Sequence, residues 1–245
     1  MNPSICWAVA RRVLLQLRRD HRTVAMLLLV PCVLITLLWW MFDGNEAMFN
    51  ALGPPLLAMF PFIVMFLVTS VTSLRERSSG TLERLLTMPM AKLDLLVGYS
   101  LAFGLVALVQ ALLAVSLAVG LLGLDVGGPL WALGLVAVAD AVLGTTLGLF
   151  VSAFAETEFQ AVQFMPAVVI PQILLCGLFV SRDSLPDVLG AVSDVLPLSY
   201  AVDAMSSLQS SSTLGSDVWL DLVVITGFVL ALVGLGAATL RRRTA

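Results

Sequence analysis

Long runs of apolar residues, separated by short polar segments, dominate the pattern along this chain of 245 residues. A hydrocarbon core of roughly 30 Å requires about 20 apolar residues in a helix. Six runs reach that length: 24–42, 53–74, 95–122, 130–154, 159–180 and 218–240. The third run is long, which indicates a tilted helix or one that extends beyond the bilayer. Strand-like alternation is absent, so the pattern predicts an all-α membrane protein with six transmembrane helices.

The composition supports a single transmembrane domain over residues 1–245. Hydrophobic residues make up 60% of the chain and charged residues 12%, and the mean hydropathy is +1.03. A soluble protein is nearer to half apolar and about a quarter charged. There are too few polar residues to cover a water-facing surface, so the chain is expected to fold in lipid.

The distribution of basic residues predicts that both termini are cytoplasmic. With the N-terminus inside, Arg182 is the only one of the 13 basic residues in an outer segment. The inner ones are Arg11, Arg12, Arg18, Arg19, Arg22, Arg75, Arg77, Arg84, Lys92, Arg241, Arg242 and Arg243. The same topology places Trp39, Trp40, Trp131 and Trp219 at the outer interface, where an aromatic belt is expected.

The first apolar run is not a cleaved signal peptide. It is too long for such a segment, and Asp43 to Glu46 follow it instead of a small-residue cleavage site. Cys6, Cys32 and Cys176 lie on the inner side or within spans, and their spacing matches no metal site. We therefore expect neither an extracellular disulfide nor a bound metal.

Residues 2–22 predict a basic amphipathic helix on the inner membrane surface. Apolar residues such as Trp7 and Leu14 alternate with five arginines there, and the segment is too charged to span the bilayer. Two interpretations remain: an orientation signal, or an elbow helix that leads into the first span.

The inner loop 75–94 is predicted to contain a short helix. Gly80 and Pro89 delimit about two helical turns between them. The leucines at positions 82, 85 and 86 share one face, which needs a cover because so short a helix is marginal alone in water. The cover is either the protein's own inner helices or a groove on a cytosolic partner. The candidate contact residues are Leu82, Glu83, Arg84, Leu85 and Leu86.

The second inner loop is short and acidic, with Glu156 and Glu158 on either side of Thr157. These carboxylates suit a basic partner surface, although a solvated turn fits the charge equally well. The outer stretch 181–217 predicts two short amphipathic helices, which begin after Pro186 and Pro197. We expect a hairpin that dips into the outer leaflet or caps the bundle, followed by a mobile loop at 206–216.

Two features within the spans are candidates for the transport pathway. Asp140 lies near the centre of the fourth span, where a carboxylate is costly and is functional by default. The alternatives are a structural residue that pins two helices or one that bonds to hydroxyls such as that of Thr145. The second span offers a possible greasy substrate surface, although lipid contact also fits the pattern. Its residues are Met59, Phe60, Phe62, Met65 and Phe66.

Three stretches carry a resemblance that covers nearly the whole chain. The inner stretch runs from Arg75 to Lys92 and contains Gly-Thr-Leu-Glu-Arg-Leu-Leu before a proline; the second, 171–180, closes the fifth span. The third is the outer hairpin, with Leu-Pro-Leu-Ser-Tyr-Ala at 196–201, including Tyr200. Together they resemble the permease subunit of type-2 bacterial ABC exporters, the family of daunorubicin-resistance membrane proteins.

This resemblance implies a mechanism and partners. Two six-span permeases, identical or related, form the pathway, and two cytosolic ABC ATPase subunits bind ATP and Mg and drive it through the coupling helices. Gly-x-x-x-x-Gly-Lys-[Ser/Thr] is absent from this chain, so we expect no enzyme activity and no cofactor in it. The implied function is export of a hydrophobic or amphipathic substrate, drug or lipid-like, across the bacterial plasma membrane, and no nucleic acid is involved.

The main alternative is a proton-coupled secondary drug transporter that uses Asp140. Such carriers need no exposed leucine helix in the cytosol, and the chain shows no convincing internal repeat. An intramembrane protease is excluded in practice. The only histidine, His21, lies at the cytosolic edge of the first span, and Asp221 lies near the outer end of the sixth, not opposite Asp140.

Overall fold

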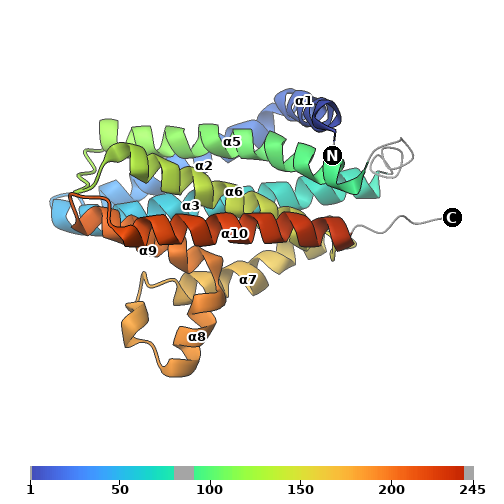
Figure 1. The fold of residues 1–245 in the computed structure, drawn as a ribbon. Coiled ribbons are helices and arrows are strands. Elements are labelled where there is room, and N and C mark those ends of the chain that lie inside the picture. Colours follow the sequence, from blue (N-terminus) through green and yellow to red (C-terminus); the bar gives the residue numbers. More distant parts are fainter. Residues whose placement is uncertain (1, 80–90, 240–245) are drawn as a thin grey trace.

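The computed structural model describes residues 2–79 and 91–239, and their regular structure is entirely helical (Figure 1). The elements are α1 (Pro3–Arg19), α2 (His21–Met41), α3 (Glu46–Ser78), α5 (Lys92–Gly120), α6 (Leu130–Ser152), α7 (Glu158–Leu175), the short 3-10 helix η1 (Arg182–Ser184), α8 (Asp187–Val195), α9 (Pro197–Ser210) and α10 (Ser216–Thr239). Within these residues, α2, α3, α5, α6, α7 and α10 are long and apolar enough to cross a membrane. The prediction of six spanning helices is confirmed.

Two spans differ in length from the sequence prediction. Helix α3 begins at Glu46 and has 33 residues, about 50 Å at 1.5 Å per residue, so it extends well beyond the hydrocarbon core. Helix α7 ends at Leu175 rather than at residue 180. Gly177 explains the early end, because its φ of 96° is left-handed and a right-handed helix cannot pass through it.

Helix α6 forms the centre of the bundle, with α3 beside it (Figure 1). Sixteen residues of α6 are buried, and over residues 143–149 they cover every side of the helix, as expected for a helix that is apolar on all sides. Gly144 and Gly148 allow the close approach to α3. A Cβ at either glycine would lie 2.5 Å from a backbone oxygen, that of Phe62 or Phe66 respectively.

Helix α1 lies across one end of the bundle, the end at which α3 finishes and α5 begins (Figure 1). Its buried face packs mainly against α5. Gly98 of α5 makes this possible, because a Cβ there would lie 2.6 Å from the Cβ of Val9. The last turn of α10 lies at the same end, which agrees with both termini on one membrane side; the cytoplasmic assignment stays a prediction.

The predicted outer hairpin is present as α8 and α9, which meet at 93°. Helix α9 packs against α3, α6 and α10, whereas α8 lies at the side of the bundle (Figure 1). The hairpin therefore enters the bundle instead of covering its end. The predicted loop at 206–216 is wrong in its first part, because α9 continues to Ser210.

Candidate functional site

The two described ends of the inner loop are fastened to other helices. At the end of α3, Arg75 donates two hydrogen bonds to the carboxylate of Glu158, at the start of α7, with N···O distances of 3.0 and 3.2 Å. The neighbouring Glu76 accepts from Arg12 of α1 at 2.8 Å. The predicted partner-contact residues between them lie outside the described residues: Leu82, Glu83, Arg84, Leu85 and Leu86.

The start of α5 is tied to α1 as well. The carboxylate of Asp94 accepts from the backbone N–H of Asn2 at 3.0 Å and from that of Ala91 at 3.2 Å. Asn2 in turn caps α1 through its side chain, which accepts from the N–H of Ser4. Helix α1 is thus fixed to the polypeptide on both sides of the inner loop, by Arg12 on one side and by Asn2 on the other.

The two glutamates of the acidic second loop, Glu156 and Glu158, have different surroundings. The carboxylate of Glu158 is already held by Arg75. Glu156 uses its backbone N–H, which donates to Gln160 at 2.8 Å, and its side chain forms no ion pair with another described residue. Of the two predicted contact residues, Glu156 therefore keeps a free carboxylate, while Glu158 links α7 to α3.

Asp140 is completely buried at mid-length of α6, with an exposed fraction of 0%. Neither carboxylate oxygen has a hydrogen-bond partner among the residues that the structure describes. The alternative of a bond to the Thr145 hydroxyl is wrong, because that hydroxyl donates to the carbonyl of Ala141 at 3.0 Å. A buried, unpaired carboxylate requires an explanation, and function is the usual one.

Four of the five apolar candidates of α3 are buried in the bundle, whereas Phe60 is only partly buried. The buried ones are Met59, Phe62, Met65 and Phe66. Met59 is 6% exposed, and the other three are fully buried. Lipid contact, one of the two interpretations, is therefore wrong for these residues. Their use as a substrate surface remains a prediction, and it requires α3 to separate from a neighbouring helix.

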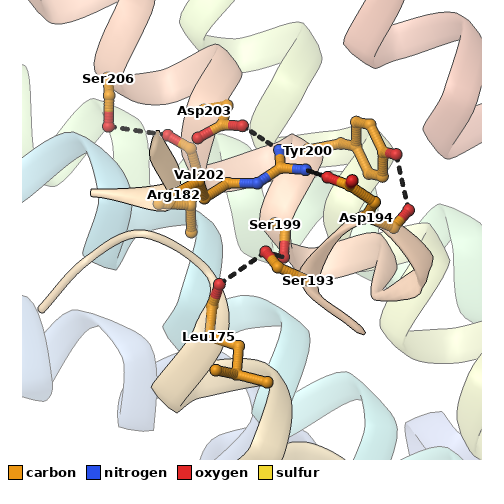
Figure 2. Close-up of polar contacts among 9 residues, drawn as sticks. All are labelled: Leu175, Arg182, Ser193, Asp194, Ser199, Tyr200, Val202, Asp203 and Ser206. Carbon is orange, nitrogen blue, oxygen red and sulfur yellow. Dashed lines mark hydrogen bonds and ion pairs between the residues drawn. The ribbon is translucent and has the colours of Figure 1, made fainter. Parts of the chain in front are cut away.

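The outer hairpin is organised around Arg182, the single basic residue predicted outside (Figure 2). Its guanidinium pairs with Asp194 of α8 at 2.5 Å and with Asp203 of α9. It also lies over the ring of Tyr200, 5.0 Å from the centroid. The Tyr200 hydroxyl donates to the backbone oxygen of Asp194 at 2.7 Å. We call Arg182, Asp194, Tyr200 and Asp203 the outer polar cluster; it joins η1, α8 and α9.

The corner between α8 and α9 rests on the end of α7 (Figure 2). Ser193 donates to the carbonyl of Leu175 at 2.8 Å, which satisfies one of the last carbonyls of α7. Gln172 accepts from the backbone N–H of Leu198 at 3.4 Å, a free donor in the first turn of α9. The predicted prolines lie where expected, Pro186 at the N-cap of α8 and Pro197 at the first position of α9.

Gln110 of α5 was not singled out from the sequence. It is fully buried and donates from Nε2 to the backbone oxygen of Leu27 in α2 at 2.7 Å. Leu27 lies four residues before Pro31, which has no N–H to offer that oxygen. The signal was available: a proline inside a span exposes one carbonyl, and glutamine is one of the few donors within the other spans.

Residues 4–210 match the model of the ABC-2 type transporter family, and the chain belongs to that family. Together with the six spans, this makes it a multi-pass membrane protein of the permease class.

Three relatives illustrate the similarity. Over 182 residues the chain is 25% identical to the probable multidrug ABC transporter permease YbhS of Escherichia coli, which covers 74% of this chain and 48% of that protein. Over 150 residues it is 29% identical to the inner membrane transport permease YhhJ of Escherichia coli, covering 60% and 39%. Over 203 residues it is 24% identical to ABC transporter G family member 20 of Dictyostelium discoideum, covering 82% and 28%. The chain thus spans less than half the length of each of these relatives.

Proposed function

We propose that this chain is the transmembrane subunit of an ATP-driven exporter in a bacterial plasma membrane. Membership of the ABC-2 type transporter family supports this proposal. In the proposed arrangement, a separate ATPase subunit supplies the nucleotide chemistry by binding ATP and Mg. The proposed substrate is hydrophobic or amphipathic, drug-like or lipid-like. The name of one relative, a probable multidrug permease, supports this class of substrate.

The fastening of the inner loop is the observation that carries the proposal. Residues 80–90 connect α3 to α5, and the flanking residues are held by Arg75–Glu158, Arg12–Glu76 and Asn2–Asp94 contacts. A force applied to this loop therefore acts on α1, α3, α5 and α7 together. In the proposed mechanism Leu82, Leu85 and Leu86 dock into a groove of the ATPase, with Glu83, Arg84 and the free carboxylate of Glu156 around them.

The remaining partners are a second permease, identical or related, and the surrounding lipid. Two ATPase subunits act on the pair. Lipid contact at the inner surface is supported by α1, whose outward face carries Trp7, 64% exposed. Arg11 and Arg18 of α1 are exposed as well and form no ion pair among the described residues. Such a face attracts anionic headgroups.

The pathway is proposed to involve Asp140 and the buried methionine and phenylalanine residues of α3, Met59, Phe62, Met65 and Phe66. Asp140 is the one feature that also favours the second candidate, a proton-coupled secondary transporter, because such carriers use buried carboxylates. Asp140→Asn keeps the size of the side chain and removes its charge. Loss of transport with an intact complex supports a pathway role in either mechanism, whereas normal transport shows that Asp140 only packs.

Docking of the inner loop is tested with Leu85→Asp. Candidate ABC ATPase subunits from the same genome are co-expressed with the permease, and the complex is purified through a tag on the permease. Leu85→Asp is expected to leave membrane insertion intact and to release the ATPase, because a charge cannot occupy an apolar groove. Glu156→Gln serves as the milder comparison. Unchanged co-purification of the ATPase with Leu85→Asp contradicts the docking proposal.

A further inference from the structure

The proline in α2 leaves a specific gap in its hydrogen bonding. In a regular helix the carbonyl of residue 27 accepts from the N–H of residue 31, and Pro31 has none. In lipid, no water reaches such a carbonyl, so another donor of the protein is needed. The donor is Nε2 of Gln110, 2.7 Å away on α5.

The position of α2 makes this contact important. Helix α2 buries only a narrow stripe, Leu27, Pro31, Ile35 and Leu38, and exposes large side chains such as Met26 and Val33 on its other sides. Apolar packing alone holds helices weakly in lipid, because lipid tails are as apolar as leucine. In the described part of the chain, the bond from Gln110 is the one hydrogen bond between α2 and α5, and it lies at the interrupted turn.

The side chain of Gln110 makes no second hydrogen bond to the described residues. Its side chain is 0% exposed, and Oε1 has no hydrogen-bond partner there. Burying an amide whose oxygen makes no hydrogen bond costs free energy. A glutamine is therefore a poor choice at this position if it only fills space. The side chain is thus dedicated to the carbonyl that Pro31 leaves free.

We infer that Gln110 is a positioning residue that couples α5 to α2 at the Pro31 turn. Helix α5 begins directly after the inner loop, and α1, which packs on α5, leads into α2. A displacement of α5 reaches α2 through the directional Gln110–Leu27 bond, at the turn where α2 bends most easily. The inference rests on the proposed function, because it assigns Gln110 to the transmission of ATPase movement.

The experiment uses three variants of the full complex in proteoliposomes: Gln110→Leu, Pro31→Ala and the double variant. Gln110→Leu is expected to lower the Tm by several degrees and to reduce transport of an amphipathic dye about tenfold at nearly unchanged ATPase activity. In the double variant, the N–H of residue 31 again serves Leu27. Its Tm is expected to return close to that of the wild type, while transport stays low.

Two results overturn the inference. If the double variant recovers transport along with Tm, Gln110 only satisfies a carbonyl and transmits nothing. If the Tm changes of the two single variants are additive, the contact itself is absent. The Tm cycle does not depend on ATP. A wild-type complex without ATP-driven transport therefore refutes the proposed function separately from the contact.

Discussion

The close contact between α3 and α6 yields a quantitative prediction for Gly148→Ala. A Cβ at this position would lie 2.5 Å from the carbonyl oxygen of Phe66 and 3.2 Å from its carbonyl carbon and Cα. All three of these atoms belong to the backbone of Phe66, so none of them can rotate away as the end of a side chain can. Since ordinary C···O contacts begin at about 3.3 Å, the two helix backbones must separate by about 0.8 Å.

The expected cost follows from overpacking. Inserting a methyl group into a well-packed interior destabilises by about 1–3 kcal/mol. Alanine also gains up to about 1 kcal/mol of helix propensity over glycine, which acts in the opposite direction. Gly134 of the same helix supplies the matched control, because its nearest neighbour is a side-chain atom of Leu112 at the ordinary distance of 3.7 Å. Both variants share the propensity gain, so their difference isolates the contact with α3.

The assay is thermal unfolding of the purified protein in detergent. Gly148→Ala is expected to unfold below Gly134→Ala by about 2–4 °C for each kcal/mol of the packing difference. Equal Tm values for the two variants refute the reasoning, because they show that α3 and α6 do not approach as closely as described.

Two further predictions concern polar contacts at the surface. Arg182→Met leaves Asp203, 37% exposed, without its cation and is expected to destabilise by about 1–3 kcal/mol, less than for a fully buried pair; the double variant with Asp203→Asn should recover part of the Tm. Asp20 caps α2, and hydrogen bonds from the hydroxyl and N–H of Thr23 lower its pKa. A carboxyl with a lowered pKa stabilises the fold above its unfolded pKa, and the contribution disappears as the pH falls through the folded value. Asp20→Ala is therefore expected to cost about 1 kcal/mol at pH 7, and its difference in Tm from the wild type should shrink below about pH 4.

The spans were predictable because length and apolarity are local properties of the sequence. Which side of a span faces the bundle was not predictable, because α3 is apolar on nearly all sides. Its periodicity does not separate Phe62 from a lipid-facing residue. The early end of α7 depends on the backbone angle of one residue, Gly177, which a hydropathy pattern does not contain.

The candidate sites divide in the same way. The prolines of the hairpin act on their own backbone, so Pro186 and Pro197 revealed where α8 and α9 begin. Arg182 was read only as a charge on the outer side, because its partners lie 12 and 21 residues away. The role of Gln110 depends on a helix 83 residues away and needed the folded structure.

The proposed function requires that a separate ATPase subunit drives transport by this permease. The most direct test uses inverted membrane vesicles that contain the permease and its ATPase partner, with an amphipathic fluorescent dye supplied outside the vesicles as the probe. ATP without a proton gradient is expected to drive dye accumulation, and Leu85→Asp is expected to abolish it. Accumulation driven by a proton gradient alone, unaffected by ATP and by Leu85→Asp, contradicts the account and favours a secondary transporter that uses Asp140.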